Sequence, residues 1–160
     1  MMLSVQGFAP ALRHAGAAVI VAALLAPVAA WADDSKLTLH SATGDYTFNV
    51  QVVDTDESRA KGLMYVTELA EDAGMLFDFK QERGVSFWMR NTFIPLDMIF
   101  VGADGIVKNI HVNARPHDPT SIPSEGPVQF VLEIPGGRSV EIGLKPGDTM
   151  EHDRVAKPAG

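Results

Sequence analysis

After residue 74 the sequence becomes a series of short apolar runs with turn-forming residues between them. The runs are GMLFDF, VSFWMRN, PLDMIFV, IVKNIHVN and VQFVLEIP. The dipeptide Asp104-Gly105 separates two of them and is a strong signal for a tight hairpin turn, and Gly136-Gly137 follows the last run. Many short strands joined by turns are typical of an antiparallel β-barrel or a β-sandwich.

The region before these runs adds one hairpin and one short helix. Apolar and polar residues alternate on both sides of a turn at Thr43-Gly44, which predicts a hairpin over residues 36–53. Asp54 or Thr55 can cap a helix whose acidic start and basic later turn suit the helix dipole. We therefore predict a mainly β fold, a small antiparallel β-barrel or sandwich, with one short helix over about residues 55–64. The segment RSVEIGLKPGDTM is expected to form a last short strand and a loop.

The first 32 residues have the pattern of a secretory signal peptide. An apolar stretch begins at Ala15, Pro27 interrupts it, and Ala30-Trp31-Ala32 fits the small-x-small rule for cleavage. The alternative is an uncleaved membrane anchor, but the run is short, rich in alanine and broken by proline. We expect cleavage near Ala32, a periplasmic or secreted protein without a stable membrane span, one β-rich domain over residues 33–152, and a frayed tail over 153–160.

Composition excludes several classes of function. The 160 residues carry a formal net charge of −7, which makes a nucleic acid an unsuitable partner. The chain has no cysteine, so disulfides, a thiolate nucleophile and Cys-ligated metal centres are excluded. No phosphate-binding loop, dinucleotide fingerprint or serine-hydrolase elbow occurs, the histidine spacing matches no standard metal motif, and no cofactor is predicted.

Several motifs follow one another in a distinctive order. They are Arg59-x-x-Gly62-Leu63-Met64, Gly74-Met75-Leu76-Phe77, Phe87-Trp88-Met89-x-Asn91-Thr92-x-x-Pro95-Leu96-Asp97, Asp104-Gly105, Val131-Leu132-Glu133 and Gly147-Asp148. Over roughly residues 36–150 this series resembles the uncharacterised bacterial and archaeal family known as domain of unknown function 192. The resemblance implies a small β-rich domain, often exported. It implies no reaction, cofactor or catalytic residue.

The run FWMRNTFIPLDMIF contains polar residues that an apolar run would not be expected to hold. Asn91 and Thr92 precede Pro95, where side chains commonly close turns by bonding to the backbone, and Asp97 follows the turn. The three residues are therefore either turn-closing groups or part of a site. Read as a site, the ligand-binding candidates are Arg59, Met64, Trp88, Met89, Asn91, Thr92 and Asp97.

Glu133 is a second carboxylate in an apolar run. If it and Asp97 face the same pocket, the pair can act as general acid and general base, which makes both of them catalytic candidates. They can equally be salt-bridge partners of arginines. The alternative function to consider is then a hydrolase of envelope glycans.

Methionine offers a third possibility. Met64, Met75, Met89 and Met98 all lie in the family-like motifs, and clustered thioethers can bind Cu(I) in an oxidising compartment. Methionine is also an adaptable core residue that packs against aromatic rings.

The leading hypothesis from the sequence is a non-enzymatic exported domain that binds a small ligand or an envelope protein. Its binding face would lie near Trp88, and a ring-stacking ligand such as a sugar would suit that face. The alternatives are the acid–base hydrolase, the copper-binding protein, and an assembly factor whose motifs only specify the fold.

Overall fold

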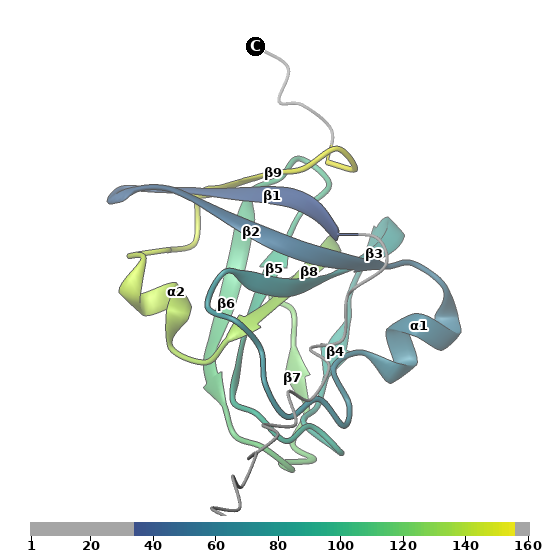
Figure 1. Ribbon diagram of the computed structural model, residues 1–160. Helices are drawn as coiled ribbons and strands as arrows, with labels where there is room; N and C mark the ends of the chain where they lie inside the picture. The colour runs from purple at the N-terminus through teal and green to yellow at the C-terminus, as the bar shows by residue number, and fades with distance from the viewer. Residues whose placement is uncertain (1–33, 156–160) are drawn as a thin grey trace, which may run out of the picture. The chain divides into compact units, whose positions relative to one another are not determined.

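The computed structural model describes residues 34–155, and within them the chain forms a curled seven-stranded sheet, a two-stranded sheet and two short helices (Figure 1). The strands are β1 (Asp34–Ser41), β2 (Gly44–Val53), β3 (Ala73–Arg83), β4 (Ser86–Phe87), β5 (Leu96–Val101), β6 (Val107–Ala114), β7 (Ile122–Pro123), β8 (Val128–Pro135) and β9 (Thr149–Glu151), and the helices are α1 (Asp56–Lys61) and α2 (Arg138–Glu141). The prediction of a mainly β fold is confirmed. The predicted signal peptide and residues 156–160 lie outside the described residues.

The large sheet has the order β6-β5-β8-β3-β2-β1-β9, and its two edges meet at one end. All neighbours are antiparallel except β2 and β3, which are parallel because α1 and the loop after it form a crossover. The Val107 N–H donates to Asp148 O at 2.9 Å, and the Met150 N–H donates to Gly105 O at 2.8 Å. These bonds join the start of β6 to β9, so the sheet closes part of a barrel there.

The central strands are buried on both faces. All of β5 is buried, and so are six of the eight residues of β8. Since side chains alternate between faces, each strand supplies two cores. The first core lies on one face and contains Leu37, Phe48, Leu76, Ile99, Phe130, Leu132 and Ile134, among others. The second core lies on the other face and contains Leu63, Met75, Phe77, Met89, Met98, Phe100 and Val131, among others.

The predicted helix is present but shorter than expected. Thr55 caps α1, its side chain accepting a bond from the Ser58 N–H, so the capping box uses Ser58. The helix ends at Lys61 because Gly62 adopts a positive φ of 48° and donates its N–H to Ser58 O. Residues 62–64, which were predicted to be helical, instead form the wall of a pocket described below.

Two predicted strands differ in the structure. The run VSFWMRN pairs only at Ser86–Phe87, where β4 meets β7, and the chain then turns because Asn91 has a φ of 60°. The segment from Arg138, predicted as a strand and a loop, begins as helix α2 and becomes a strand only at β9. Its sequence does not distinguish one helical turn from a short strand.

The packed domain also extends beyond its predicted end at residue 152. Arg154 Nη1 lies 2.7 Å from Asp54 Oδ2 and 3.2 Å from Asp78 Oδ2. Val155 is 8% exposed and belongs to the first core. The predicted frayed tail therefore does not begin at residue 153. None of the helices within residues 34–155 is long and apolar enough to cross a membrane.

A test of this packing comes from two glycines. A Cβ added at Gly74 would lie 2.7 Å from Glu133 O, whereas one added at Gly84 would meet no atom within 4 Å. We predict that Gly74→Ala lowers the free energy of unfolding by about 1–3 kcal/mol, because β3 and β8 must separate. Gly84→Ala should change it by less than about 0.5 kcal/mol in the same urea titration. Equal effects would contradict this close strand contact.

Candidate functional site

Asp97 is completely buried, and its carboxylate is fully bonded within the protein. Oδ1 accepts bonds from the backbone N–H groups of Asn113 and Gly137, both at 2.7 Å. Oδ2 accepts from the Ser139 N–H at 2.7 Å and from the Ser139 hydroxyl at 2.5 Å. A carboxylate has about four acceptor positions, and all are used. Asp97 therefore joins β5 to β6 and to the start of α2, and it has no acceptor left for a ligand.

Glu133 is buried without such bonds. It lies on β8, is 4% exposed, and pairs across the sheet with Met75 on β3 and Met98 on β5. Its Oε2 atom is buried and has no hydrogen-bond partner among the described residues. Burial raises the pKa of this carboxyl from its ordinary 4.5 to about 8. Glu133 therefore carries a proton at neutral pH and can donate a hydrogen bond.

The two carboxyl groups lie on opposite faces of the sheet. Residues that pair directly across neighbouring strands point to the same face. Asp97 pairs with Ile134 of the first core, whereas Glu133 pairs with Met98 of the second core. The shared pocket that an acid–base pair needs is therefore not formed, and the geometry does not support the hydrolase hypothesis.

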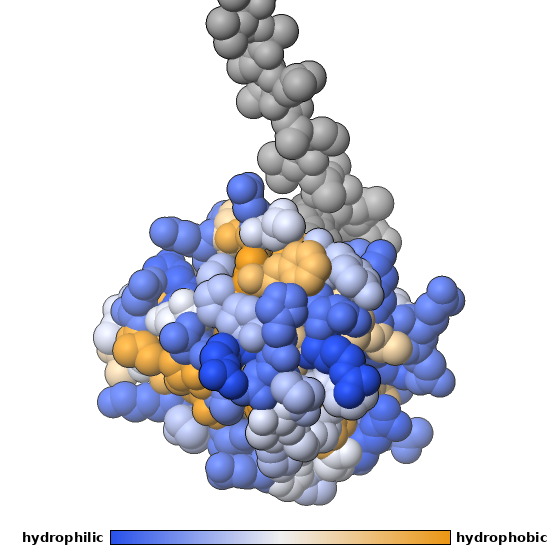
Figure 2. Space-filling model, turned by 90° about the horizontal axis from the view of Figure 1, so that it is seen from below, coloured by the Kyte–Doolittle hydropathy of each residue, from blue (hydrophilic) through white to orange (hydrophobic). Residues whose placement is uncertain are grey.

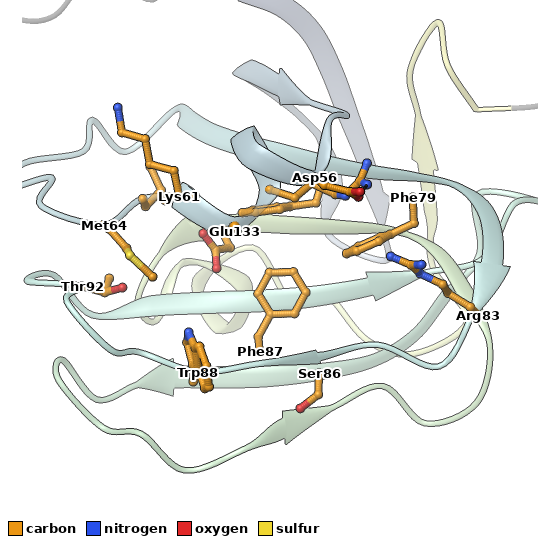
Figure 3. A pocket seen from close by; sticks show the side chains of 15 residues that line it. Asp56, Lys61, Met64, Phe79, Arg83, Ser86, Phe87, Trp88, Thr92 and Glu133 are labelled. Carbon is orange, nitrogen blue, oxygen red and sulfur yellow. Dashed lines mark hydrogen bonds and ion pairs between the residues drawn. The ribbon is translucent and has the colours of Figure 1, made fainter.

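A cavity of about 330 Å³ opens in front of Glu133 (Figure 3). Its lining comes from α1 and the turn after it, from β3, from β4 and the turn after it, and from β8. The lining residues are Asp56, Arg59, Ala60, Lys61, Gly62, Leu63, Met64, Phe77, Phe79, Arg83, Ser86, Phe87, Trp88, Thr92 and Glu133. Phe77 and Phe87 pack edge to face with their ring centroids 5.0 Å apart. The cavity thus combines apolar aromatic walls with one protonated acid, as small-molecule sites often do.

Two arginines flank the ring of Phe79 at one side of the cavity. The Arg59 guanidinium carbon lies 5.2 Å from the ring centroid and that of Arg83 lies 4.9 Å from it. Arg59 is held in place, since Nη1 donates to the carbonyls of Asp54 and Asp78 and Nη2 pairs with Asp56. Within residues 34–155, Arg83 has no carboxylate partner. Arg59 therefore fastens α1 to β3, while the charge of Arg83 stays uncompensated.

The opposite side of the cavity is formed by two turns that support each other. Tyr65 and Asn91 have φ values of 65° and 60°, a left-handed conformation that is uncommon outside glycine. The Tyr65 N–H donates to Asn91 O at 2.9 Å, and the Asn91 amide donates to the Met64 sulfur at 3.9 Å. Beside them Trp88 is 50% exposed. Strained backbone of this kind often lies at binding sites, where surrounding bonds hold it.

The structure brings together four of the seven ligand-binding candidates. Arg59, Met64, Trp88 and Thr92 line the cavity. Asn91 lies behind Met64 and bonds to it. The remaining two candidates are elsewhere: Met89 is completely buried in the second core, and Asp97 is on the other face of the sheet.

Sequence reasoning missed the aromatic walls and two of the cations, Lys61 and Arg83. Phe77, Phe79 and Phe87 belong to strand-like runs and look like ordinary core residues. Arg83 ends a polar segment and looks like a surface residue. One signal was available: Phe77 and Phe79 alternate on β3 and so share a face. Which face that is depends on the register with β8, which the sequence does not give.

The methionines form part of the second core. Met75 and Met98 flank Glu133 on the neighbouring strands, but they and Met89 are no more than 3% exposed. Met64 is the one methionine that lines the cavity. This arrangement matches methionine as a core residue. Over residues 34–155 no three His, Asp or Glu side chains gather in a way that could hold a metal ion.

Comparisons with known proteins agree with this fold. A family model named DUF192 and described as an uncharacterized ACR matches residues 38–152. One solved structure, a candidate transcription regulator from Sinorhizobium meliloti 1021, has a TM-score of 0.75 and 40% identity, covering 77% of this chain and 96% of the other. Another, a protein of unknown function from Novosphingobium aromaticivorans, has a TM-score of 0.71 and 46% identity, covering 72% and 83%. A search of curated proteins finds no match.

The bonds of Asp97 generate a stability prediction. Asp97→Asn places an amide where a carboxylate now accepts from Ser139, which leaves buried N–H groups facing one another. We predict a loss of about 3 kcal/mol in the free energy of unfolding. Asp45→Asn is the control: it alters a surface pair with His40, the Asp45 side chain is 71% exposed, and the change should cost under about 1 kcal/mol. A mild effect of Asp97→Asn would mean that its four bonds contribute little.

Glu133 generates a pH prediction. Between about pH 4.5 and pH 8 the unfolded chain loses this proton while the folded protein keeps it. The free energy of unfolding should therefore fall with rising pH, by up to about 1.4 kcal/mol per pH unit, and level off above pH 8. Glu133→Gln does not titrate, so its stability should fall less over the same range. Urea titrations at pH 5, 6, 7 and 8 measure the difference between the two proteins, and parallel curves would contradict a raised pKa.

Proposed function

This chain belongs to the DUF192 family of uncharacterised proteins, and from its own cavity we propose that it is a non-enzymatic binding protein for a small molecule. The proposal rests on Glu133. A buried polar atom without a partner costs about 1–3 kcal/mol, and replacing the whole group by an apolar one would remove that cost. An acid kept in this state at the end of an open cavity is best explained by a ligand that completes its hydrogen bonds.

The cavity wall describes the rest of the ligand. Phe77, Phe87 and Leu63 offer an apolar surface of the kind that holds a ring or a compact hydrocarbon group. Trp88 is half exposed at the same cavity, so a ring can stack on it near the mouth. The proposed ligand therefore has an apolar or ring-shaped body and a polar group that reaches the Glu133 carboxyl. A sugar fits the Trp88 side of the cavity better than its aromatic interior.

The proposed place of action is outside the cytoplasm. The support is the N-terminal pattern of an apolar stretch followed by Ala30-Trp31-Ala32. A protein exported in this way would serve to bind, buffer or present its ligand in the cell envelope.

The S. meliloti protein is described as a transcription regulator, and we do not propose that role for this chain. This chain has a formal net charge of −7, and its helices within residues 34–155 have six and four residues. Reading the major groove of DNA commonly uses a longer helix and a basic surface.

The experiment is a fragment screen by NMR on the chain without residues 1–32. Fragments that combine one ring with one polar group should shift the amide signals of Leu63, Phe87 and Thr92. Glu133→Met should then weaken the best fragment at least about tenfold while raising the free energy of unfolding, because it removes an unbonded buried acid.

Glu141→Met, an exposed site on α2, is the matched control: it should leave fragment affinity unchanged and, because it removes a surface ion pair with Arg138, should lower the free energy of unfolding by less than about 1 kcal/mol. If no fragment binds at millimolar concentration, or if the shifts lie away from the cavity, the proposal is overturned. A Cu(I) titration in the same spectra tests the copper hypothesis, which expects the methyl signals of Met64 and Met75 to move together.

A further inference from the structure

The cavity that we propose as the binding site has an excess of positive charge. Its lining holds three basic side chains, Arg59, Lys61 and Arg83, against one ionised carboxylate, Asp56. Glu133 adds no negative charge while it holds its proton. The lining therefore carries a net charge of +2 in a chain whose formal net charge is −7. Such a local reversal of sign in a concave, partly desolvated site concentrates the field on whatever enters it.

Among these cations, Arg83 is the one placed to meet a ligand. Arg59 is occupied by two carbonyls and by Asp56. In Figure 3 the Lys61 side chain extends away from Glu133, whereas the guanidinium end of Arg83 points toward the ring of Phe79 and the interior of the cavity. Arg83 has no partner carboxylate in the described part of the chain and presents a planar set of donors, which suits a carboxylate or phosphate oxygen pair.

Resting on the binding function proposed above, we infer that the ligand is a small organic anion with a carboxylate or similar acidic group. The acidic group pairs with Arg83 beside Phe79, and the apolar body lies against Phe77 and Phe87. The far end of the ligand accepts a hydrogen bond from the Glu133 carboxylic acid. Lys61 adds attraction at the mouth without direct contact.

The same geometry argues against a cationic ligand. An ammonium group would favour ionised Glu133 and could face the aromatic rings, which is an attractive combination in isolation. In this cavity it would be repelled by Arg83 and Lys61, neither of which is neutralised by a neighbouring acid within residues 34–155. On the face seen in Figure 2, apolar patches lie at the left and near the top, with strongly hydrophilic side chains between them.

Three probes of nearly equal shape test the inference. They are 4-hydroxyphenylacetate (anion), 4-hydroxyphenylethanol (neutral) and tyramine (cation), each titrated by NMR into the chain without residues 1–32. We expect the anion to bind at least about tenfold more tightly than the neutral probe and tyramine to bind most weakly. Raising the salt concentration should weaken the binding of the anion and leave the affinity for the neutral probe unchanged.

Arg83→Gln should remove the preference for the anion and leave the affinity for the neutral probe intact. Arg90→Gln is the control, because Arg90 lies 4.7 Å from the Trp88 ring centroid but does not line the cavity. If the neutral probe or tyramine binds as tightly as the anion, or if Arg83→Gln leaves the preference unchanged, the anion inference is overturned and the binding function stands. If none of the three binds at millimolar concentration, the anion inference is overturned, and the binding function is overturned with it when the fragment screen also finds no binder.

Discussion

The burial of β5 and β8 on both faces is the constraint that organises the rest of this protein. No side chain of β5 reaches water, and hardly any side chain of β8 does. Each polar group on these strands must therefore find a partner inside the protein or remain unbonded at a cost. Two buried carboxyl groups lie on these strands, one on each face of the sheet, and they differ in their hydrogen bonding. Asp97 is fully bonded, and Glu133 is not.

The two carboxyl groups therefore have different roles: Asp97 stabilises the fold, whereas Glu133 belongs to the proposed binding site. Asp97 accepts from three backbone N–H groups and one hydroxyl, and through them it joins β5 to β6 and to the start of α2. Glu133 makes no such bond, and the side chains around it are apolar. Selection for stability alone would favour an apolar residue at position 133. The retained acid, the strained turns at Tyr65 and Asn91, and the uncompensated Arg83 all lie around one cavity.

The wall of that cavity depends on interactions that hold short elements onto the large sheet. The helix α1 has six residues and no buried side chain, so its own sequence does little to fix its position. Arg59 fixes it, since this one side chain bonds to carbonyls before the helix and on β3. The turn after β4 is held similarly, because its backbone bonds to Tyr65 on one side and to Asp118 on the other. Pocket shape is thus set by a few polar contacts at the edge of the second core.

Local patterns in the sequence were sufficient for much of the fold. Alternation of polar and apolar residues identified the hairpin of β1 and β2, and the turn residues identified most later strands. The same patterns failed where one or two hydrogen bonds determine the secondary structure. The sequence of α2, a single helical turn, is equally compatible with a strand. The run VSFWMRN was predicted as one strand, but it leaves the sheet after Phe87. The interpretation of Asp97 as a turn-closing residue was available from the sequence. The partners of that carboxylate were not, because they lie 16 to 42 residues away along the chain.

The sequence by itself determined that this is a small β-rich domain of one family, with two carboxyl groups in apolar strands. It did so because periodicity and turn chemistry act over a few residues. The tertiary structure alone decided that the two acids face opposite ways, since a shift of one residue in the register between β5 and β8 would reverse the answer. It alone also decided that Glu133 and Arg83 line one cavity, because these two residues lie on the neighbouring strands β8 and β3, whose pairing the sequence does not give.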